Sequence, residues 1–332
     1  MSPAIAPVAL AIETHGLTKQ FGRQTAVAGI DLAVPAESVF GFLGPNGSGK
    51  TTTIRMLLGL AGATSGEISL LGRTMPGSLR AVLPRVGALV EGPAFYPFLS
   101  GAANLRRLDT ADPGASAGTR AERVKRALDR VGLSHAAGKK VHAYSLGMKQ
   151  RLGIANALLM PRDLLILDEP TNGLDPQGTR EVRSLVRSLA AEGTTVFVSS
   201  HLLAEVEQMC SHVAVMRAGS LVAQGTLDEL RGAGEAHVRI LTPDGAAARQ
   251  VLERLGIPPV PVVPVVPVVS LVSAADTADE LSAVLTRAAP PPEVIVAALV
   301  AADVRVRGFT VASASLEERF VALTGEGFDV AQ

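Results

Sequence analysis

The chain of 332 residues contains no tryptophan, one cysteine and no excess of either sign of charge. Aromatic residues make up 3% of it. Because Lys+Arg and Asp+Glu both number 31, the sequence lacks the overall positive field that attracts nucleic acids, and no nucleic-acid partner is expected. Cys210 has no second cysteine to pair with, which excludes an intrachain disulfide and fits a buried, unreactive thiol in a reducing cytosol.

Long hydrophobic runs that could cross a membrane are also missing. The longest uncharged apolar stretch, 257–275, has five prolines between positions 258 and 267, and these block a regular helix. Its Pro-Val-rich segment 257–269 repeats Pro-Val-Val, which predicts polyproline II or an extended linker. No Lys or Arg precedes the apolar start of the chain, so residues 1–9 are predicted to be a flexible tail and not a signal peptide.

Hydrophobic residues make up 47% of the chain and charged residues 19%, which excludes a disordered scaffold. The length of 332 residues suits about two globular domains. Short apolar runs at 38–44, 164–168 and 194–200 are typical of buried strands, and 121–132 has the apolar spacing of an amphipathic helix. This alternation predicts an α/β fold with a parallel sheet covered by helices.

The composition changes after residue 233 to Val-rich and Ala-rich sequence with clustered prolines. We therefore expect a first domain over 10–233 and a small α+β accessory domain over 234–332. A capping box formed by Ser315 and Glu318 predicts that the last segment begins a helix.

The segment GPNGSGKT matches the phosphate-loop pattern G-x-x-x-x-G-K-[ST] in full. It follows an apolar strand, and a helix is predicted from Lys50 onward. Backbone amides of such a loop and of the helix N-terminus surround phosphate oxygens. Lys50 supplies a charge to the β- and γ-phosphates, and the Thr51 hydroxyl can bind Mg²⁺. The predicted nucleotide-binding residues of this loop are Gly44, Pro45, Asn46, Gly47, Ser48, Gly49, Lys50, Thr51 and Thr52.

A second apolar strand, in LLILDEP, ends at two adjacent carboxylates, Asp168 and Glu169. Ligands of open α/β sheets bind at the carboxyl ends of strands, so both carboxylates are expected beside the phosphate loop. Asp168 is predicted to hold Mg²⁺, and Glu169 to orient or deprotonate the attacking water. Alone, the pair would fit a solvated turn. Together with the phosphate loop, it predicts a nucleoside triphosphatase.

The segment YSLGMKQRLGIANALL is similar to the signature segment of ATP-binding-cassette (ABC) ATPases. Ser145 and Gly147 match the S-x-G of that motif. Tyr144, Leu146 and Met148 depart from its commoner form, LSGGQ. In the family this segment reaches the γ-phosphate held by the opposite subunit. The resemblance therefore implies ATP as the nucleotide and a head-to-tail dimer with a second ATP-binding subunit, expected to be a homodimer.

Further positions of the domain predicted at 10–233 match the same family, which also implies a helical subdomain at about 92–160. Phe21 stands where the family has the aromatic ring that stacks on adenine. Asp175, in NGLDP, stands where the family has the D-loop that lies between its two ATPase subunits. His201 corresponds to the switch histidine that contacts the γ-phosphate. The predicted catalytic residues are therefore Glu169, His201 and Lys50.

One position departs from the family. Where the family usually places a glutamine that links Mg²⁺ and water to the membrane partner, this chain has Glu91. A carboxylate can still bind the metal, but it adds negative charge beside the phosphates. In the alternative interpretation, Glu91 is a polar loop residue and the linking residue lies nearby. The predicted Mg²⁺ ligands are Thr51, Asp168 and Glu91.

Two segments resemble particular groups within the family. EGPAFYP resembles ATPases of the bacitracin-export and lantibiotic-immunity groups, and SLEERFVALTG resembles the C-terminal extension of daunorubicin-resistance-type ATPases. The resemblance implies a peripheral subunit at the cytoplasmic face of the cell membrane. Its ATP hydrolysis would drive a separate transmembrane permease that exports an antibiotic, drug or similar compound.

Three alternatives stay open at this point. The first is the ABC ATPase of an importer or of a lipid or polysaccharide exporter, although SLGMKQ in place of LSGGQ weighs against an importer. The second is a mechanochemical ABC ATPase outside transport, against which the single phosphate loop argues. The third is a regulatory module that binds ATP without turnover, and the intact Lys50 and Glu169 argue against it.

Overall fold

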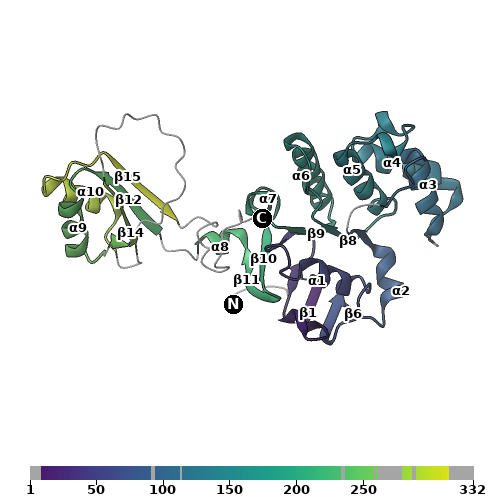
Figure 1. Ribbon diagram of the computed structural model, residues 1–332, viewed down its shortest axis with the longest axis horizontal. Coiled ribbons are helices and arrows are strands. Elements are labelled where there is room, and N and C mark those ends of the chain that lie inside the picture. Colours follow the sequence, from purple (N-terminus) through teal and green to yellow (C-terminus); the bar gives the residue numbers. More distant parts are fainter. Residues whose placement is uncertain are drawn as a thin grey trace, which may run out of the picture. The chain divides into compact units, whose positions relative to one another are not determined.

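The computed structural model describes residues 9–90, 94–112, 114–232, 236–257, 259–260, 279–285 and 289–313. These residues form two compact units, one that ends at Leu227 and one that begins at Asp228 (Figure 1). The division lies a few residues before the boundary predicted after residue 233. The predictions that fall outside the described residues concern Glu91, nearly all of the tail 1–9, most of the segment 257–269 and the helix expected from Ser315.

A six-stranded sheet forms the centre of the first unit and contains the three strands predicted from apolar runs. Its order is β11-β10-β4-β9-β8-β7, and every neighbouring pair is parallel except β10 with β11. All residues of β4, β8 and β9 are buried, as expected for strands covered on both faces. The strands are β4 (Val39–Leu43), β7 (Val86–Leu89), β8 (Leu164–Asp168), β9 (Thr195–Ser200), β10 (His212–Arg217) and β11 (Ser220–Thr226).

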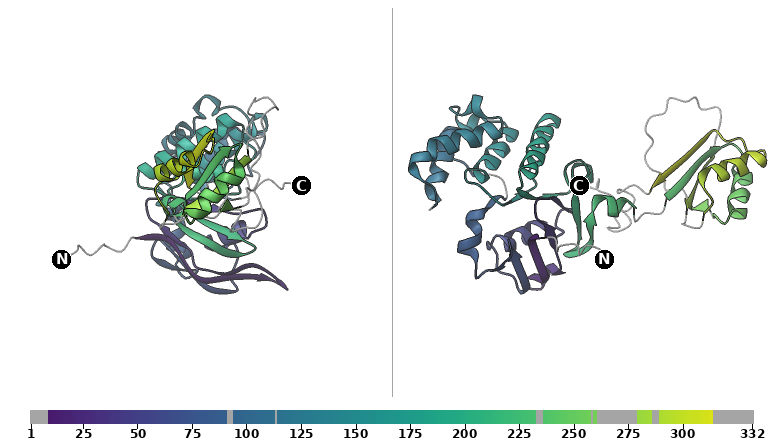
Figure 2. Two further views of the ribbon diagram at one scale, coloured as in Figure 1. Left: turned by 90° about the vertical axis from the view of Figure 1, so that its left-hand side faces the viewer. Right: turned by 180° about the vertical axis from the view of Figure 1, so that it is seen from behind.

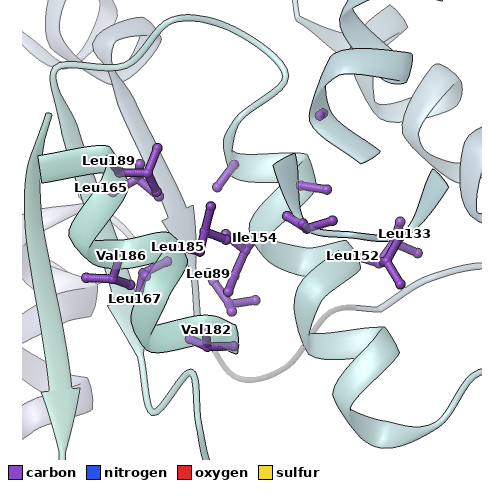
Figure 3. Packing of buried hydrophobic residues seen from close by; sticks show 14 of the residues in the cluster. Leu89, Leu133, Leu152, Ile154, Leu165, Leu167, Val182, Leu185, Val186 and Leu189 are labelled. Atoms are coloured by element: carbon purple, nitrogen blue, oxygen red, sulfur yellow. The ribbon is translucent and has the colours of Figure 1, made fainter. Parts of the chain in front are cut away.

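Residues of these strands alternate between two hydrophobic cores, because successive side chains of a strand point to opposite faces. In β8, Leu165 and Leu167 belong to the core that the helices cover, and Ile166 belongs to the other core. Figure 3 shows Leu165 and Leu167 against side chains of α6, including Val186 and Leu189. The helices of this unit are α1 (Lys50–Leu57), α2 (Leu79–Val82), α3 (Gly101–Ala111), α4 (Arg120–Arg130), α5 (Leu146–Ala157), α6 (Pro176–Ala191), α7 (Leu203–Met209) and α8 (Leu227–Gly232), which runs into the second unit.

The predicted amphipathic helix is α4. Its apolar face is buried in the helix-covered core, and that face consists of Val124, Ala127, Leu128 and the adjoining Val131. The central-sheet face opposite these helices packs against α1 and an antiparallel sheet. In that sheet β1 pairs with β2, β3 and β5, and β5 pairs with β6. Its strands are β1 (Leu10–Phe21), β2 (Gln24–Ile30), β3 (Ala33–Pro35), β5 (Ser65–Leu70) and β6 (Arg73–Met75).

The second unit is an α+β fold, drawn in yellow-green in Figure 2, and its described elements after α8 have the order β-α-β-β-α-β. Its antiparallel sheet has the order β13-β14-β12-β15. Val238 pairs with Ala283 and Ile240 with Leu281, and these side chains share one core with both helices, so α9 and α10 cover the same sheet face. The elements are β12 (Ala236–Thr242), α9 (Gly245–Arg254), β13 (Pro259–Val260), β14 (Asp279–Leu285), α10 (Pro292–Ala301) and β15 (Gly308–Ser313).

Two sequence expectations can be compared with this fold directly. Among the described residues, no helix combines the length and the apolar character that a membrane span needs. Desolvation and the negative charge of Glu205 raise the pKa of the half-buried Cys210 thiol to about 12, so this thiol is protonated at neutral pH.

Candidate functional site

The phosphate loop joins the end of β4 to the start of α1, which begins at Lys50 as predicted. Gly49 caps the helix with a φ of 103°, a conformation that residues with a Cβ rarely adopt. A Cβ at Gly49 would lie 2.5 Å from the Ala26 carbonyl oxygen, and one at Gly44 would lie 2.6 Å from the Met216 carbonyl oxygen. Both glycines of the motif are therefore required, because the backbone of neighbouring strands leaves no room for a Cβ at either position.

Lys50 is held at the loop by the carbonyl oxygens of Gly44 and Pro45 and by a carboxylate. Only 5% of its surface is exposed. Its Nζ donates a hydrogen bond of 2.6 Å to the Gly44 carbonyl oxygen and lies 3.5 Å from Glu169 Oε1. Burial lowers the pKa of Lys50, and the negative charge of Glu169 opposes that shift. The Lys50 ammonium group therefore lies between the backbone of the loop and the Glu169 carboxylate.

Asp168 lies beside the loop, as its place at the end of β8 predicted. Thr51 Oγ1 donates to Asp168 Oδ2 at 2.9 Å, and Ser199 Oγ donates to the other oxygen, Oδ1, at 2.5 Å. A hydroxyl and a carboxylate are the hard oxygen donors that Mg²⁺ prefers. The structure thus brings two of the three predicted Mg²⁺ ligands together, and the third, Glu91, lies outside the described residues.

Glu169 occupies a strained backbone position next to the lysine and the histidine. Its φ of 48° is in the left-handed region, which non-glycine residues rarely adopt. Its Oε2 lies 2.7 Å from His201 Nδ1, and its Oε1 is the oxygen that faces Lys50. The side chains of Glu169 and His201 are 21% and 28% exposed. Glu169 therefore contacts both of the other predicted catalytic residues, and its carboxylate can still contact solvent or a substrate.

A cavity of about 570 Å³ is lined by the phosphate loop, Glu169 and Phe21. Its volume is in the range of small-molecule sites in proteins. The Phe21 ring is 53% exposed, and Lys19 Nζ lies 4.9 Å from the ring centroid. Bases stack on such rings at about 1–3 kcal/mol per base. The cavity therefore offers a stacking surface for a base and a basic, amide-lined loop for phosphates.

Ser145, Gly147 and Asp175 are absent from the described residues that line this cavity. Ser145 caps α5, and its hydroxyl oxygen accepts a backbone N–H at 3.2 Å. Asp175 caps α6 and accepts a backbone N–H at 3.0 Å. The two helix starts are adjacent, because a Cβ at Gly147 would lie 3.5 Å from Leu174 Cδ2. The structure thus groups these three predicted residues with one another and leaves them out of the cavity wall.

Two residues beside the carboxylates did not emerge from the sequence. Ser199 contacts both Asp168 and the backbone of Glu169, and Glu205 accepts a hydrogen bond from Thr171 at 2.6 Å. A usable signal was the polar end of the buried strand TVFVSS, because buried serines need partners. The partners themselves lie 31 and 34 residues away along the chain, so no local pattern identifies them.

A phosphate loop, a buried lysine and paired carboxylates at the carboxyl edge of a parallel sheet define a P-loop nucleoside triphosphatase. A family model described as ABC transporter matches residues 27–172. The bacitracin transport ATP-binding protein BcrA of Enterococcus faecalis is 43% identical over 243 residues, which cover 73% of this chain and 78% of that protein. The daunorubicin/doxorubicin resistance ATP-binding protein DrrA of Streptomyces peucetius is 35% identical over 321 residues, with coverage of 96% and 94%. The chain belongs to the ABC transporter ATP-binding family, and it is an ATPase of that family.

Solved structures agree with this fold. Protein cbiO1 of Clostridium perfringens, described as part of the ABC transporter complex cbiONQ, is 26% identical to the chain. It aligns with a TM-score of 0.62 over 75% of this chain and 96% of its own. The predicted α/β fold of a P-loop ABC ATPase is confirmed.

Proposed function

We propose that this chain is the ATP-hydrolysing subunit that powers a separate membrane permease for the export of an antibiotic, a drug or a similar compound. The observation that carries the proposal is that Glu169, which lines the cavity with Lys50, contacts both Lys50 and His201. Its cargo class is supported by the relatives, whose names refer to bacitracin transport and to daunorubicin resistance. The match to DrrA covers 96% of this chain, which extends the likeness beyond the nucleotide-binding unit.

ATP would bind with its base on Phe21 and its phosphates in the loop. Lys50 Nζ would exchange its contact with Glu169 Oε1 for phosphate oxygens, which frees that oxygen to accept a proton from the attacking water. Glu169 Oε2 would stay with His201 Nδ1, so the histidine fixes the direction of the base. The Thr51 hydroxyl and the Asp168 carboxylate would hold Mg²⁺. When bound, this ion supplies charge neutralisation for the β- and γ-phosphates.

A second copy of the chain would complete each site. Ser145 and Gly147 lie at the N-terminus of α5, where a helix favours anions, yet they take no part in the wall of their own chain's cavity. We infer that they reach the ATP held by the other subunit, with Asp175 at the contact between the subunits. Closure and reopening of this dimer at the cytoplasmic face of the membrane would drive the permease.

The variant Glu169→Gln tests the assignment. It keeps the shape of the side chain but removes the base, so steady ATP hydrolysis is expected to fall about 100-fold or more while ATP still binds. Glu122→Gln, an exposed position that pairs with Arg126 on α4, is the matched control and keeps normal turnover. Unchanged hydrolysis in Glu169→Gln would exclude this residue as the base. Co-expression with the permease then links turnover to export of the drug from cells.

A further inference from the structure

The end of β9 contacts the segment that carries the two carboxylates through one buried hydroxyl. Ser199 Oγ donates to Asp168 Oδ1 at 2.5 Å and accepts the Glu169 backbone N–H at 2.9 Å. Ser199 itself is fully buried. Because this hydroxyl donates to one partner and accepts from the other, both partners fix its orientation, and burial keeps water from competing for them.

A second contact holds the same segment two residues further on. Glu205, in the first turn of α7, accepts hydrogen bonds at Oε2 from Thr171 Oγ1 at 2.6 Å and from Ser200 Oγ at 3.1 Å. Thr171 and Ser200 are 6% and 1% exposed. Hydroxyl donors to a carboxylate make strong hydrogen bonds. The chain on the far side of Glu169 is therefore also fixed to β9 and α7.

The residue between these two contacts is the strained one. Glu169 keeps a φ of 48°, and a strained conformation of this kind persists only where several surrounding contacts hold it in place. Ser199 binds its backbone N–H, and Glu205 binds the side chain of Thr171. His201, which follows β9 directly, contacts its carboxylate. The strand thus sets the position of the base and of the histidine together.

We propose that Ser199 and Glu205 are positioning residues for ATP hydrolysis, which together clamp the segment 168–171 against β9 and α7. The clamp keeps Asp168 turned toward Thr51 and Glu169 turned toward the phosphate loop. This inference rests on the proposed function, since it takes Glu169 as the base. Ser199 and Glu205 are absent from the described residues that line the cavity, and the phosphate loop and Phe21 lie outside the clamped segment, so the clamp is expected to act mainly on turnover.

The first test is Ser199→Ala in the full chain, assayed for ATP hydrolysis and for binding of a fluorescent ATP analogue. Because a misplacement of about 1 Å can cost about 100-fold in rate, kcat is expected to fall about 10- to 100-fold. KM and the affinity for the analogue are expected to stay unchanged. The matched control is Ser38→Ala, which removes a buried hydroxyl that donates to the Pro35 carbonyl oxygen before the start of β4. This control keeps its kcat.

The second test is a double-mutant cycle of Thr171→Val and Glu205→Gln. Each substitution weakens the same hydrogen bond, so each is expected to lower kcat and the double variant is expected to be no slower than the slower single variant. If the loss of kcat in the double variant equals the product of the two single losses, Thr171 and Glu205 act separately, and the second contact of the clamp is overturned.

Two results would overturn the role of Ser199. One is a kcat for Ser199→Ala equal to that of Ser38→Ala. The other is a parallel loss of kcat and of analogue binding, which would mean that the substitution damages the fold. Glu169→Gln separates the proposed function from the clamp. If it keeps hydrolysis, the proposed base is wrong, whereas a dead Glu169→Gln beside a normal Ser199→Ala overturns the clamp alone.

Discussion

Replacement of Phe21 by alanine is expected to weaken the binding of adenine nucleotides without unfolding the protein. The ring is at the end of β1 and is 53% exposed, so its removal leaves no closed cavity in a core. Stacking of a base on an aromatic ring is worth about 1–3 kcal/mol. Because neighbouring groups already cover part of the ring, we take about 1–2 kcal/mol, which raises the dissociation constant about 5- to 30-fold.

The assay is isothermal titration calorimetry with two ligands, ADP and pyrophosphate. ADP has a base and pyrophosphate has none, so only ADP is expected to bind more weakly to Phe21→Ala. The matched control is Phe98→Ala, whose ring is 76% exposed and is absent from the described residues that line the cavity. That control binds both ligands normally. Equal weakening of both ligands by Phe21→Ala would refute the stacking argument, because the ring would then act through the phosphate loop.

Three further predictions concern the loop, a helix cap and the second unit. Gly49→Ala is expected to abolish ADP binding in the same calorimetric assay, because the new Cβ would collide with the Ala26 carbonyl oxygen. In the control Gly47→Ala the new Cβ has open space, and the variant suffers only the strain of a φ of 79°. Equal losses of ADP binding in both variants would refute this argument. Asp175→Ala removes the cap of α6 and is expected to lower the free energy of unfolding by about 1 kcal/mol in urea titrations, unlike the conservative Asp175→Asn, which keeps a capping oxygen. Hydrogen bonds from Arg305 lower the pKa of Asp244 to about 2 in the folded chain. The Asp244 carboxylate therefore makes its full contribution to stability above about pH 4, the pKa of an aspartate in the unfolded chain. That contribution is lost as the pH falls from about 4 to 2. Hydrogen exchange of the second unit should show that loss in the parent chain and not in Asp244→Asn.

The structural features around the site that were predicted correctly are those whose conformation is local. The phosphate loop is one contiguous segment in which glycines permit one tight turn before a helix, so its residues and the start of α1 at Lys50 follow from the sequence. Asp168 and Glu169 could be placed because a run of apolar residues marks a buried strand and its carboxyl end.

The contacts that connect these segments required the structure. Ser199 reaches Asp168 because the two residues are paired in register between β8 and β9. The apolar residues of the two strands do not set that register, since they are buried on both faces and show no alternation between polar and apolar positions. Glu205 depends further on where α7 begins after β9. Its hydrogen bond to Thr171 joins residues 34 positions apart.

The class of fold, the phosphate loop, the position of the paired carboxylates and the family could be read from the sequence, because each depends on periodicity or on a short motif. The folded chain was needed to see which oxygen of Glu169 faces Lys50, which faces His201 and which side chain binds the backbone of the strained residue. The physical reason is that these contacts depend on distances of a few ångströms between strands. Side-chain packing across the whole sheet fixes such distances, and no single segment encodes them.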